Sequence, residues 1–197
     1  MERVIVFLDY ANINSARPSM NVDFNDLLHY LSEDRFLINA YAYVPIDPRK
    51  EHGRDREIAG LWEIGYQVTT KLGTVLGESY KCDFNVEITI DLLRSAYQIR
   101  PDIITLCSGD VNFLPIVHEL RGMGIRVESA AFLRNASYKL MTQSSGFINL
   151  DEWIASSETD GVESSMETRV ESPHDQPVFL PQIENTFPTL ARDHDPV

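Results

Sequence analysis

Residues 4–9 have the sequence Val-Ile-Val-Phe-Leu-Asp, and residues 103–110 have the sequence Ile-Ile-Thr-Leu-Cys-Ser-Gly-Asp. Both are short, mostly apolar runs, as expected for strands buried on both faces of a parallel sheet. Each run leads into an aspartate, Asp9 or Asp110. In an open α/β sheet the ligand crevice lies beyond the carboxyl ends of the strands, where the strand order reverses. We therefore expect both aspartates to project into one pocket if their strands are neighbours at that point.

The pattern on either side of these runs indicates a sheet whose faces are covered by helices. Short apolar runs alternate with segments of helical periodicity up to about residue 152. Strands are expected at residues 4–8, 36–44, 66–70, 103–107 and 125–130, with a weaker candidate at 147–149. Helices are expected at residues 23–31, 54–64, 84–98, 111–123 and 136–143. Within residues 84–98, helical spacing predicts a core-facing stripe of Val86, Ile90 and Leu93.

The composition predicts one globular domain followed by an acidic tail. Of the 197 residues, 43% are hydrophobic, which is enough for a domain with its own core. Residues 155–197 contain nine acids against two arginines and show no sustained period. We therefore expect a domain at residues 1–153 and a disordered tail at 154–197. An apolar cluster at residues 177–190 could dock a protein partner, or it could touch its own domain or a neighbouring subunit.

Charge, hydropathy and cysteine content exclude several classes of protein. The net charge of −13 argues against a basic surface that coats nucleic acid. No apolar stretch approaches the roughly 20 residues of a membrane span, and the N-terminus lacks the form of a secretion signal. Cys82 and Cys107 lie next to apolar runs and are expected to be reduced. These features predict a cytoplasmic protein without a membrane segment.

The paired aspartates are candidates for a metal site, although each also has a structural interpretation. Two carboxylates held close together repel, and a hard divalent cation is the usual resolution. Asp110 could instead cap the helix that follows it, and Asp9 could brace a turn. A third polar element begins at Lys81 and contains Asp91. Lys81 could hold a phosphate or could be an ordinary surface lysine.

Three blocks of sequence, taken in order, resemble the NYN/LabA-like family of PIN-like nucleases. These blocks are residues 7–12, 81–91 and 108–113. The resemblance implies a PIN-like three-layer α/β/α fold with a central, mostly parallel sheet of strand order 3-2-1-4-5. It also implies metal-dependent cleavage of RNA. The family's sheet edges often pack together, so we also expect a homodimer, with Trp62 and Trp153 partly exposed.

The resemblance matches Asp9 and Asp110 to the family's metal-binding acids, but two other positions depart from the pattern. Asn85 stands where an aspartate at the helix start is expected, and Asn112 where the second acid of a Ser-Gly-Asp-x-Asp block is expected. An amide oxygen can bind a hard cation, but it has no charge and takes no proton from water. Asp83 could compensate if its loop bends inward. An impaired PIN-like module that binds RNA or protein without cleaving is therefore the alternative to a ribonuclease.

The resemblance and the residue chemistry together give a set of candidate site residues. The catalytic candidates are Asp9, Asn85, Asp91, Asp110 and Asn112, and the expected Mg²⁺ or Mn²⁺ ligands are Asp9, Asp110 and Asn112. The candidate RNA-binding residues are Asn12, Arg49, Lys50, Arg54, Lys81 and Arg134. The loop at residues 48–56 could alternatively be solvated, with local ion pairs. Tyr10, Tyr41, Tyr43 and Tyr80 could stack on bases, although most aromatic side chains in such a domain belong to the core.

Overall fold

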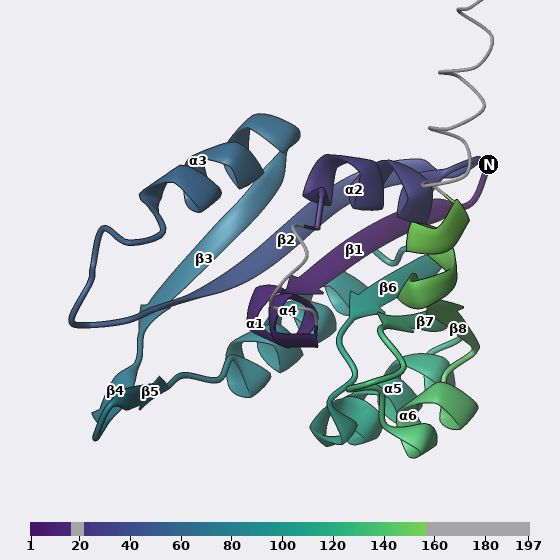
Figure 1. The fold of residues 1–197 in the computed structure, drawn as a ribbon. Helices are drawn as coiled ribbons and strands as arrows, with labels where there is room; N and C mark the ends of the chain where they lie inside the picture. The colour runs from purple at the N-terminus through teal and green to yellow at the C-terminus, as the bar shows by residue number, and fades with distance from the viewer. Residues whose placement is uncertain (17–21, 157–197) are drawn as a thin grey trace, which may run out of the picture. The chain divides into compact units, whose positions relative to one another are not determined.

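A computed structural model describes residues 1–16 and 22–156 (Figure 1). The expected docking motif at residues 177–190 lies outside these ranges, as does the predicted tail from residue 157 onward. Residues 150–156 are helical, so regular structure continues past residue 153. Within the described ranges, no helix is both long and apolar enough to cross a membrane.

A six-stranded parallel sheet forms the centre of the fold, with the strand order β3-β2-β1-β6-β7-β8. Its strands are β1 (Arg3–Asp9), β2 (Phe36–Ile46), β3 (Tyr66–Leu72), β6 (Ile103–Cys107), β7 (Arg126–Ala131) and β8 (Gly146–Asn149). The predicted order 3-2-1-4-5 is confirmed, and the weaker candidate at residues 147–149 is the edge strand β8. The order reverses between β1 and β6, so Asp9 and Asp110 lie at or just beyond the ends of two adjacent strands.

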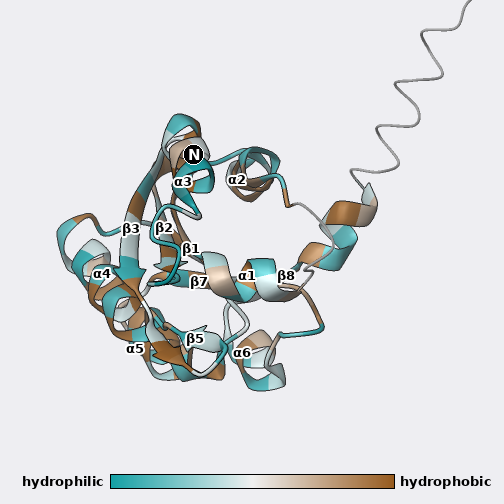
Figure 2. Ribbon diagram, turned by 60° about the vertical axis from the view of Figure 1, so that its left-hand side comes forward, coloured by the Kyte–Doolittle hydropathy of each residue, from teal (hydrophilic) through white to brown (hydrophobic). Residues whose placement is uncertain are grey.

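Helices cover both faces of the sheet, which confirms the predicted three-layer α/β/α architecture. Along β1, Val4, Val6 and Leu8 join one core cluster, whereas Ile5 and Phe7 join the other. The first cluster includes side chains of α1 (Tyr10–Ala16), α2 (Phe24–Ser32) and α3 (Asp55–Ile64). The second includes side chains of α4 (Asn85–Gln98), α5 (Leu114–Gly122) and α6 (Tyr138–Gln143). These helices carry both hydrophobic and hydrophilic segments, as Figure 2 shows.

The sequence analysis missed two elements beside the carboxyl edge of the sheet. Helix α1 begins at Tyr10, directly after β1, where no helix was predicted. Strands β4 (Thr74–Leu76) and β5 (Ser79–Lys81) form an antiparallel hairpin around Gly77, whose φ is 62°. Each hairpin strand is too short to show a period, and glycine adopts the left-handed turn without steric cost. The predicted helix at residues 111–123 begins as a 3-10 turn, η1 (Val111–Phe113), before α5.

The predicted core stripe of α4 is wrong. Val86 is 65% exposed and Ile90 is 48% exposed, while Leu93 is only partly buried. The buried side chains of α4 are Ile88, Leu92, Ser95 and Ala96. Both sets have helical spacing because α4 is apolar on more than one side. Spacing alone therefore does not identify the side that meets the sheet.

The two tryptophans differ in their surroundings. Trp62 is 61% exposed, as expected, whereas Trp153 is buried and stacks on Tyr30 with ring centroids 6.0 Å apart. The expected exposure of Trp153 is therefore wrong, because the helix at residues 150–156 packs onto the core that includes α2. The homodimer stays a prediction.

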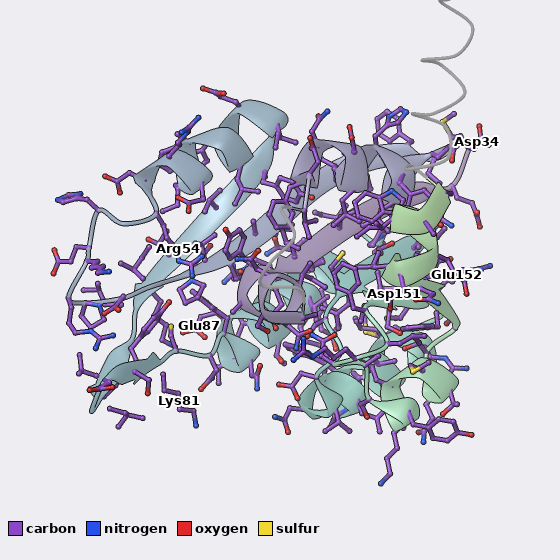
Figure 3. All side chains as sticks on the ribbon, viewed as in Figure 1. Asp34, Arg54, Lys81, Glu87, Asp151 and Glu152 are labelled. Carbon is purple, nitrogen blue, oxygen red and sulfur yellow. The ribbon has the colours of Figure 1, made fainter. Side chains whose placement is uncertain are left out.

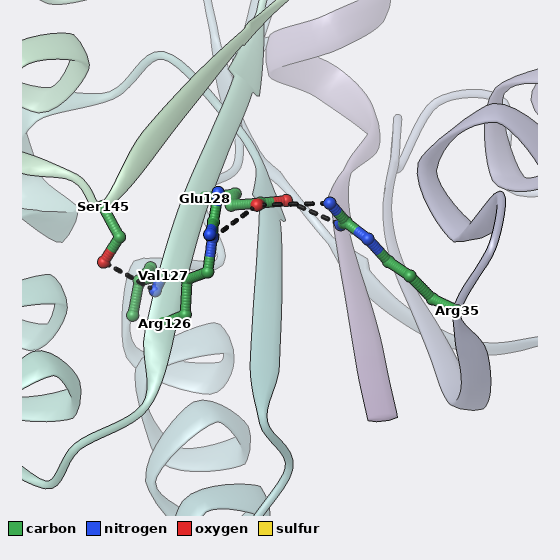
Figure 4. A network of polar contacts seen from close by, with 5 residues as sticks. All are labelled: Arg35, Arg126, Val127, Glu128 and Ser145. Carbon is green, nitrogen blue, oxygen red and sulfur yellow. Dashed lines mark hydrogen bonds and ion pairs between the residues drawn. The ribbon is translucent and has the colours of Figure 1, made fainter. Parts of the chain in front are cut away.

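A buried acid links distant strands of the sheet (Figure 4). Glu128 lies on β7 and is 3% exposed. Arg35, just before β2, lies 2.7 Å from one carboxylate oxygen, and Arg126 lies 2.8 Å from the other. Because β1 and β6 lie between β2 and β7, the Arg35 side chain bridges both of these strands. A buried carboxylate is costly without partners, so the two guanidinium groups offset its loss of hydration.

Candidate active site

The first acid of the site is Asp9, the last residue of β1. One carboxylate oxygen accepts a hydrogen bond from the backbone N–H of Asn12 at 3.2 Å, and the other accepts from the Ser108 hydroxyl at 3.1 Å. Burial raises the pKa of the Asp9 carboxyl, and the nearby charges of Asp110 and Asp83 raise it further. Asp9 is thus a carboxylate in a setting with surplus negative charge.

Ser108 connects Asp9 to the second acid, Asp110. Its side chain is fully buried, and its hydroxyl oxygen accepts from the backbone N–H of Asp110 at 3.3 Å. The same hydroxyl donates to Asp9, so one small side chain fixes the ends of both strands. The structure therefore brings Asp9 and Asp110 together around one hydroxyl at the β1/β6 edge, and we call this arrangement the acidic pocket. Ser108 belongs to the third block of the family resemblance, but its role as a link between the two acids was not predicted from the sequence.

The two asparagines converge on Asp110. Asn85, the first residue of α4, donates its side-chain amide to Asp110 at 3.3 Å, and the Asn112 amide donates to the same oxygen at 3.3 Å. The other Asp110 oxygen accepts from the Asn112 backbone N–H at 2.9 Å and caps η1. Asp110 is therefore both a cap and a member of the pocket, so the two interpretations of this residue are compatible.

Asn12 holds the loop that carries Asp110. Its side-chain oxygen accepts from the Gly109 N–H at 2.9 Å and from the Asn135 amide at 2.8 Å. A Cβ atom on Gly109 would lie 2.3 Å from the Asn135 carbonyl oxygen, so only glycine fits there. Asn12 thus acts on the pocket by positioning its backbone. Asn135 was not identified from sequence, although its place after the fifth predicted strand put it at this edge.

Asp91 lies in a separate polar cluster on α4. It accepts from the Tyr43 hydroxyl at 2.9 Å and forms an ion pair with Arg94 at 2.5 Å. Its hydrogen bonds thus go to Tyr43 and Arg94 and not to Asp9 or Asp110. Tyr43 is the register partner of Asp9 on β2, so Asp91 supports the strand next to the pocket. Asp83 precedes α4, and its charge acts directly on Asp9.

The predicted RNA-binding cations differ in whether an acidic side chain of the protein already pairs with them. Arg49 lies 2.6 Å from Asp47 and lowers the pKa of that carboxyl to about 2. Arg49 also donates to the Glu78 carbonyl at 2.9 Å, which ties its loop to the hairpin. Lys50 is exposed on the same loop. Much of the Arg49 charge is therefore engaged within the protein.

Arg54, Lys81 and Arg134 surround the same edge of the sheet. Arg54 precedes α3, and its guanidinium carbon lies 5.0 Å from the centroid of the Tyr10 ring. Lys81 is exposed at the end of the hairpin and lies on the same side of the view as Arg54 (Figure 3). Arg134 follows β7 and donates to the Ala16 carbonyl at 3.5 Å. These residues place positive charge around an acidic pocket.

The polar groups around Asp9 and Asp110 are possible ligands of a divalent cation. In the described part of the chain, no three His, Cys, Asp or Glu side chains form a ready metal cluster. The pocket does hold two carboxylates, two amide groups and a hydroxyl. Mg²⁺ is usually held by one or two carboxylates, with waters and substrate phosphates completing its shell. The residues present therefore fit a cation that is shared with a phosphate ligand.

A parallel sheet of this order, with acids at the edge where the order reverses, defines a protein with the PIN-like nuclease fold. The model of the NYN domain family matches residues 3–151, and the chain belongs to this family. The structure is similar to the crystal structure of a protein of unknown function from Vibrio parahaemolyticus RIMD 2210633, with a TM-score of 0.64 and 23% identity. That similarity covers 75% of this chain and 92% of the other, and it supports the fold. The search of curated proteins gives no match.

Proposed function

We propose that this protein is a metal-dependent ribonuclease whose reaction takes place at the pocket of Asp9 and Asp110. The observation that carries the proposal is the link of both acids to one buried hydroxyl, in a setting where burial, and to a smaller extent the charges of Asp110 and Asp83, raises the pKa of Asp9. A divalent cation would remove this repulsion and attract a phosphodiester to the same point. Membership of a PIN-like nuclease family supports the assignment.

The residues of the pocket would divide the work between binding and positioning. Asp9 and Asp110 would hold Mg²⁺ or Mn²⁺, and the amide oxygens of Asn85 and Asn112 would add neutral ligands. The bound metal would lower the pKa of a water and neutralise charge on the phosphodiester. Asp83, whose charge acts on Asp9, would add negative charge beside the cation.

Other predicted site residues would position the pocket or attract RNA without binding the metal. Asn12 would fix the loop that carries Asp110, and Asp91 would fix Tyr43 and the end of β2. Arg54, Lys50, Lys81 and Arg134 would attract the RNA backbone despite the acidic net charge. We place this activity in the cytoplasm, because Cys82 and Cys107 are free thiols.

A second function, RNA binding without cleavage, is favoured by the two asparagines. Both side-chain amides donate to Asp110, so this carboxylate has hydrogen-bond partners that require no cation. Replacing two expected acids with amides also removes two charges that would strengthen metal binding. The two functions differ in whether phosphodiester bonds are broken.

Cleavage assays on purified protein distinguish the two functions. Single-stranded and structured RNA are incubated with Mn²⁺ or Mg²⁺, and products are resolved on denaturing gels. A ribonuclease cleaves in the wild-type form and loses activity in Asp9→Asn, while Asp26→Asn, an exposed acid on α2, serves as the matched control. Asn85→Asp and Asn112→Asp are expected to raise the rate. If the wild type and the double variant are both inactive and still bind RNA, the binding function is correct.

A further inference from the structure

A hollow of about 500 Å³ lies beside the acidic pocket. It lies among α1, the end of β2, the start of α3 and the β4–β5 hairpin, and its lining includes Asn14, Pro45, Arg54 and Tyr80. Its volume is within the range of roughly 300–1,000 Å³ that is typical of small-ligand sites. The hairpin that forms one wall was not foreseen from the sequence.

The hollow lies close to Asp9 both along the chain and across the sheet. Ala11 lines it and comes two residues after Asp9. Pro45 lines it from β2, two residues beyond Tyr43, which is the register partner of Asp9. Neighbouring strands are about 4.8 Å apart. Pro45 is one strand spacing across and two residues along from Asp9, so a ligand that extends roughly 8 Å from Asp9 would reach this hollow.

Arg54 is the feature that points to an anionic ligand. It is half-buried and lies over the Tyr10 ring at 5.0 Å. Within residues 1–16 and 22–156, no carboxylate forms an ion pair with it. By contrast, Arg49 and Lys71 each have a carboxylate partner at 2.6 Å. The Arg54 guanidinium group therefore packs against the Tyr10 ring, and among the described residues no acid neutralises its charge.

A second hollow of the same volume provides a comparison. It lies between α2 and α3 and is lined by Asp23 and Glu57 together with Arg56. Tyr10 and Phe24 also line this hollow, so it too combines aromatic rings with a cation. Its two carboxylates would repel a phosphate, whereas the described residues that line the hollow of Arg54 and Tyr80 include no carboxylate. A cation that has no acid partner in the described part of the chain, together with an accessible aromatic side chain, is typical of sites for unpaired nucleotides.

We propose that the hollow lined by Arg54 and Tyr80 is a subsite for one nucleotide of single-stranded RNA, adjacent to the phosphodiester at Asp9 and Asp110. The inference rests on the proposed function for the position of that phosphodiester. Arg54 binds the phosphate of the adjacent nucleotide, and its base stacks on Tyr80. The Asn14 amide is placed to bond the base edge or the ribose. Because a duplex keeps its bases stacked internally, the subsite selects single strands.

Binding measured in EDTA tests the subsite without requiring cleavage. Fluorescence anisotropy of a labelled single-stranded oligouridylate is measured with the wild type, Arg54→Gln, Tyr80→Leu and Tyr80→Phe. We expect Tyr80→Leu to weaken binding about 5- to 100-fold, since one base stack contributes about 1–3 kcal/mol. Arg54→Gln should also weaken binding, because the phosphate loses its charged partner. Tyr80→Phe retains a ring and should bind within about threefold of wild type. The Arg54 side chain makes no capping hydrogen bond, so its loss should leave α3 intact.

Tyr97 and Arg100 provide matched controls. They line a hollow of about 370 Å³ that precedes β6 and therefore lies at the opposite edge of the sheet. Tyr97→Leu and Arg100→Gln should bind RNA within twofold of wild type, and a double-stranded RNA should bind at least tenfold more weakly than the single strand. Circular dichroism melting curves verify that each variant is folded.

The outcomes separate the subsite from the nuclease. Loss of binding in Arg54→Gln and Tyr80→Leu, with no cleavage of RNA by the wild type, supports the subsite and refutes the nuclease. Cleavage that continues at the wild-type rate in both variants, with unchanged affinity, refutes the subsite alone. Equal affinity for duplex and single strand also refutes it. A Tyr80→Leu variant that does not fold leaves Arg54→Gln and Tyr80→Phe to decide.

Discussion

Replacing Asp9 with asparagine should raise the melting temperature of the metal-free protein at neutral pH. Burial, together with the charges of Asp110 and Asp83, raises the pKa of Asp9 above its ordinary value of 3.8. The folded protein therefore holds this proton more tightly than the unfolded chain does. Ionisation of Asp9 lowers the free energy of unfolding as the pH rises from about 3.8 through the raised pKa. Asparagine is similar in shape, keeps an acceptor for the Asn12 N–H and does not ionise.

The expected change is modest without metal and reverses when metal binds. Each 1 kcal/mol of relief would correspond to about 2–4 °C in a domain of 150–250 residues. The gain should vanish near pH 4 and below, where the wild-type carboxyl is also protonated. A cation at one hundred times its Kd stabilises the folded state by about 2.7 kcal/mol, which is about 5–10 °C. Only the wild type should gain this amount, so Mn²⁺ should invert the order of the two melting temperatures.

Circular dichroism melts in EDTA and in Mn²⁺, at several pH values, provide the assay. Asp26→Asn, which removes an exposed acid, is the matched control and should follow the wild type in both conditions. The reasoning is refuted if Asp9→Asn melts below the wild type in EDTA. Equal stabilisation of both proteins by Mn²⁺ would show that Asp9 is not a metal ligand.

Three further substitutions test parts of the fold that support the pocket. Gly109→Ala should destabilise the protein by about 1–3 kcal/mol and reduce metal-dependent stabilisation, because the new Cβ would overlap the Asn135 carbonyl. A variant that unfolds at the same urea concentration as the wild type would contradict this. Asp91→Ala should cost about 1–3 kcal/mol, since the buried Tyr43 hydroxyl loses its acceptor; a loss of activity without loss of stability would instead indicate a direct catalytic role. Arg35→Met should cost about 3 kcal/mol by leaving buried Glu128 with one partner, whereas Arg3→Met, which breaks the exposed pair with Asp102, should cost less than about 1 kcal/mol; similar chemical denaturation curves for these two variants would refute the distinction.

The strands themselves, and the position of Asp9 and Asp110 at the same edge of the sheet, could be predicted from short-range patterns, whereas the strand order was implied only by the resemblance to the NYN/LabA-like family. Buried parallel strands are continuous apolar runs, and the carboxyl ends of such strands share one edge of the sheet. The side of α4 that meets the sheet could not be identified in this way. Val86 and Ile90 have the same spacing as the buried Ile88 and Leu92, and only packing against neighbouring elements distinguishes them.

The missed features depend on contacts between distant parts of the chain. The β4–β5 hairpin has strands of three residues, so neither periodicity nor length indicated it. The positions of Asn135 and Tyr43 depend on the approach of a loop and a strand to the pocket. Such side-chain geometry has no signature within a single segment of sequence.

The bridge from Arg35 to Glu128 has a consequence for how the sheet opens. β1 and β6, whose ends position the two acids, lie between the strands that this ion pair joins. If either strand slipped or separated, the ion pair between Arg35 and Glu128 would break. The buried Glu128 carboxylate would then lose one of its two guanidinium partners. We therefore expect the amide protons of β1 and β6 to exchange with solvent only through global unfolding, as one cooperative unit. The distance between Asp9 and Asp110 would then be maintained for as long as the domain remains folded.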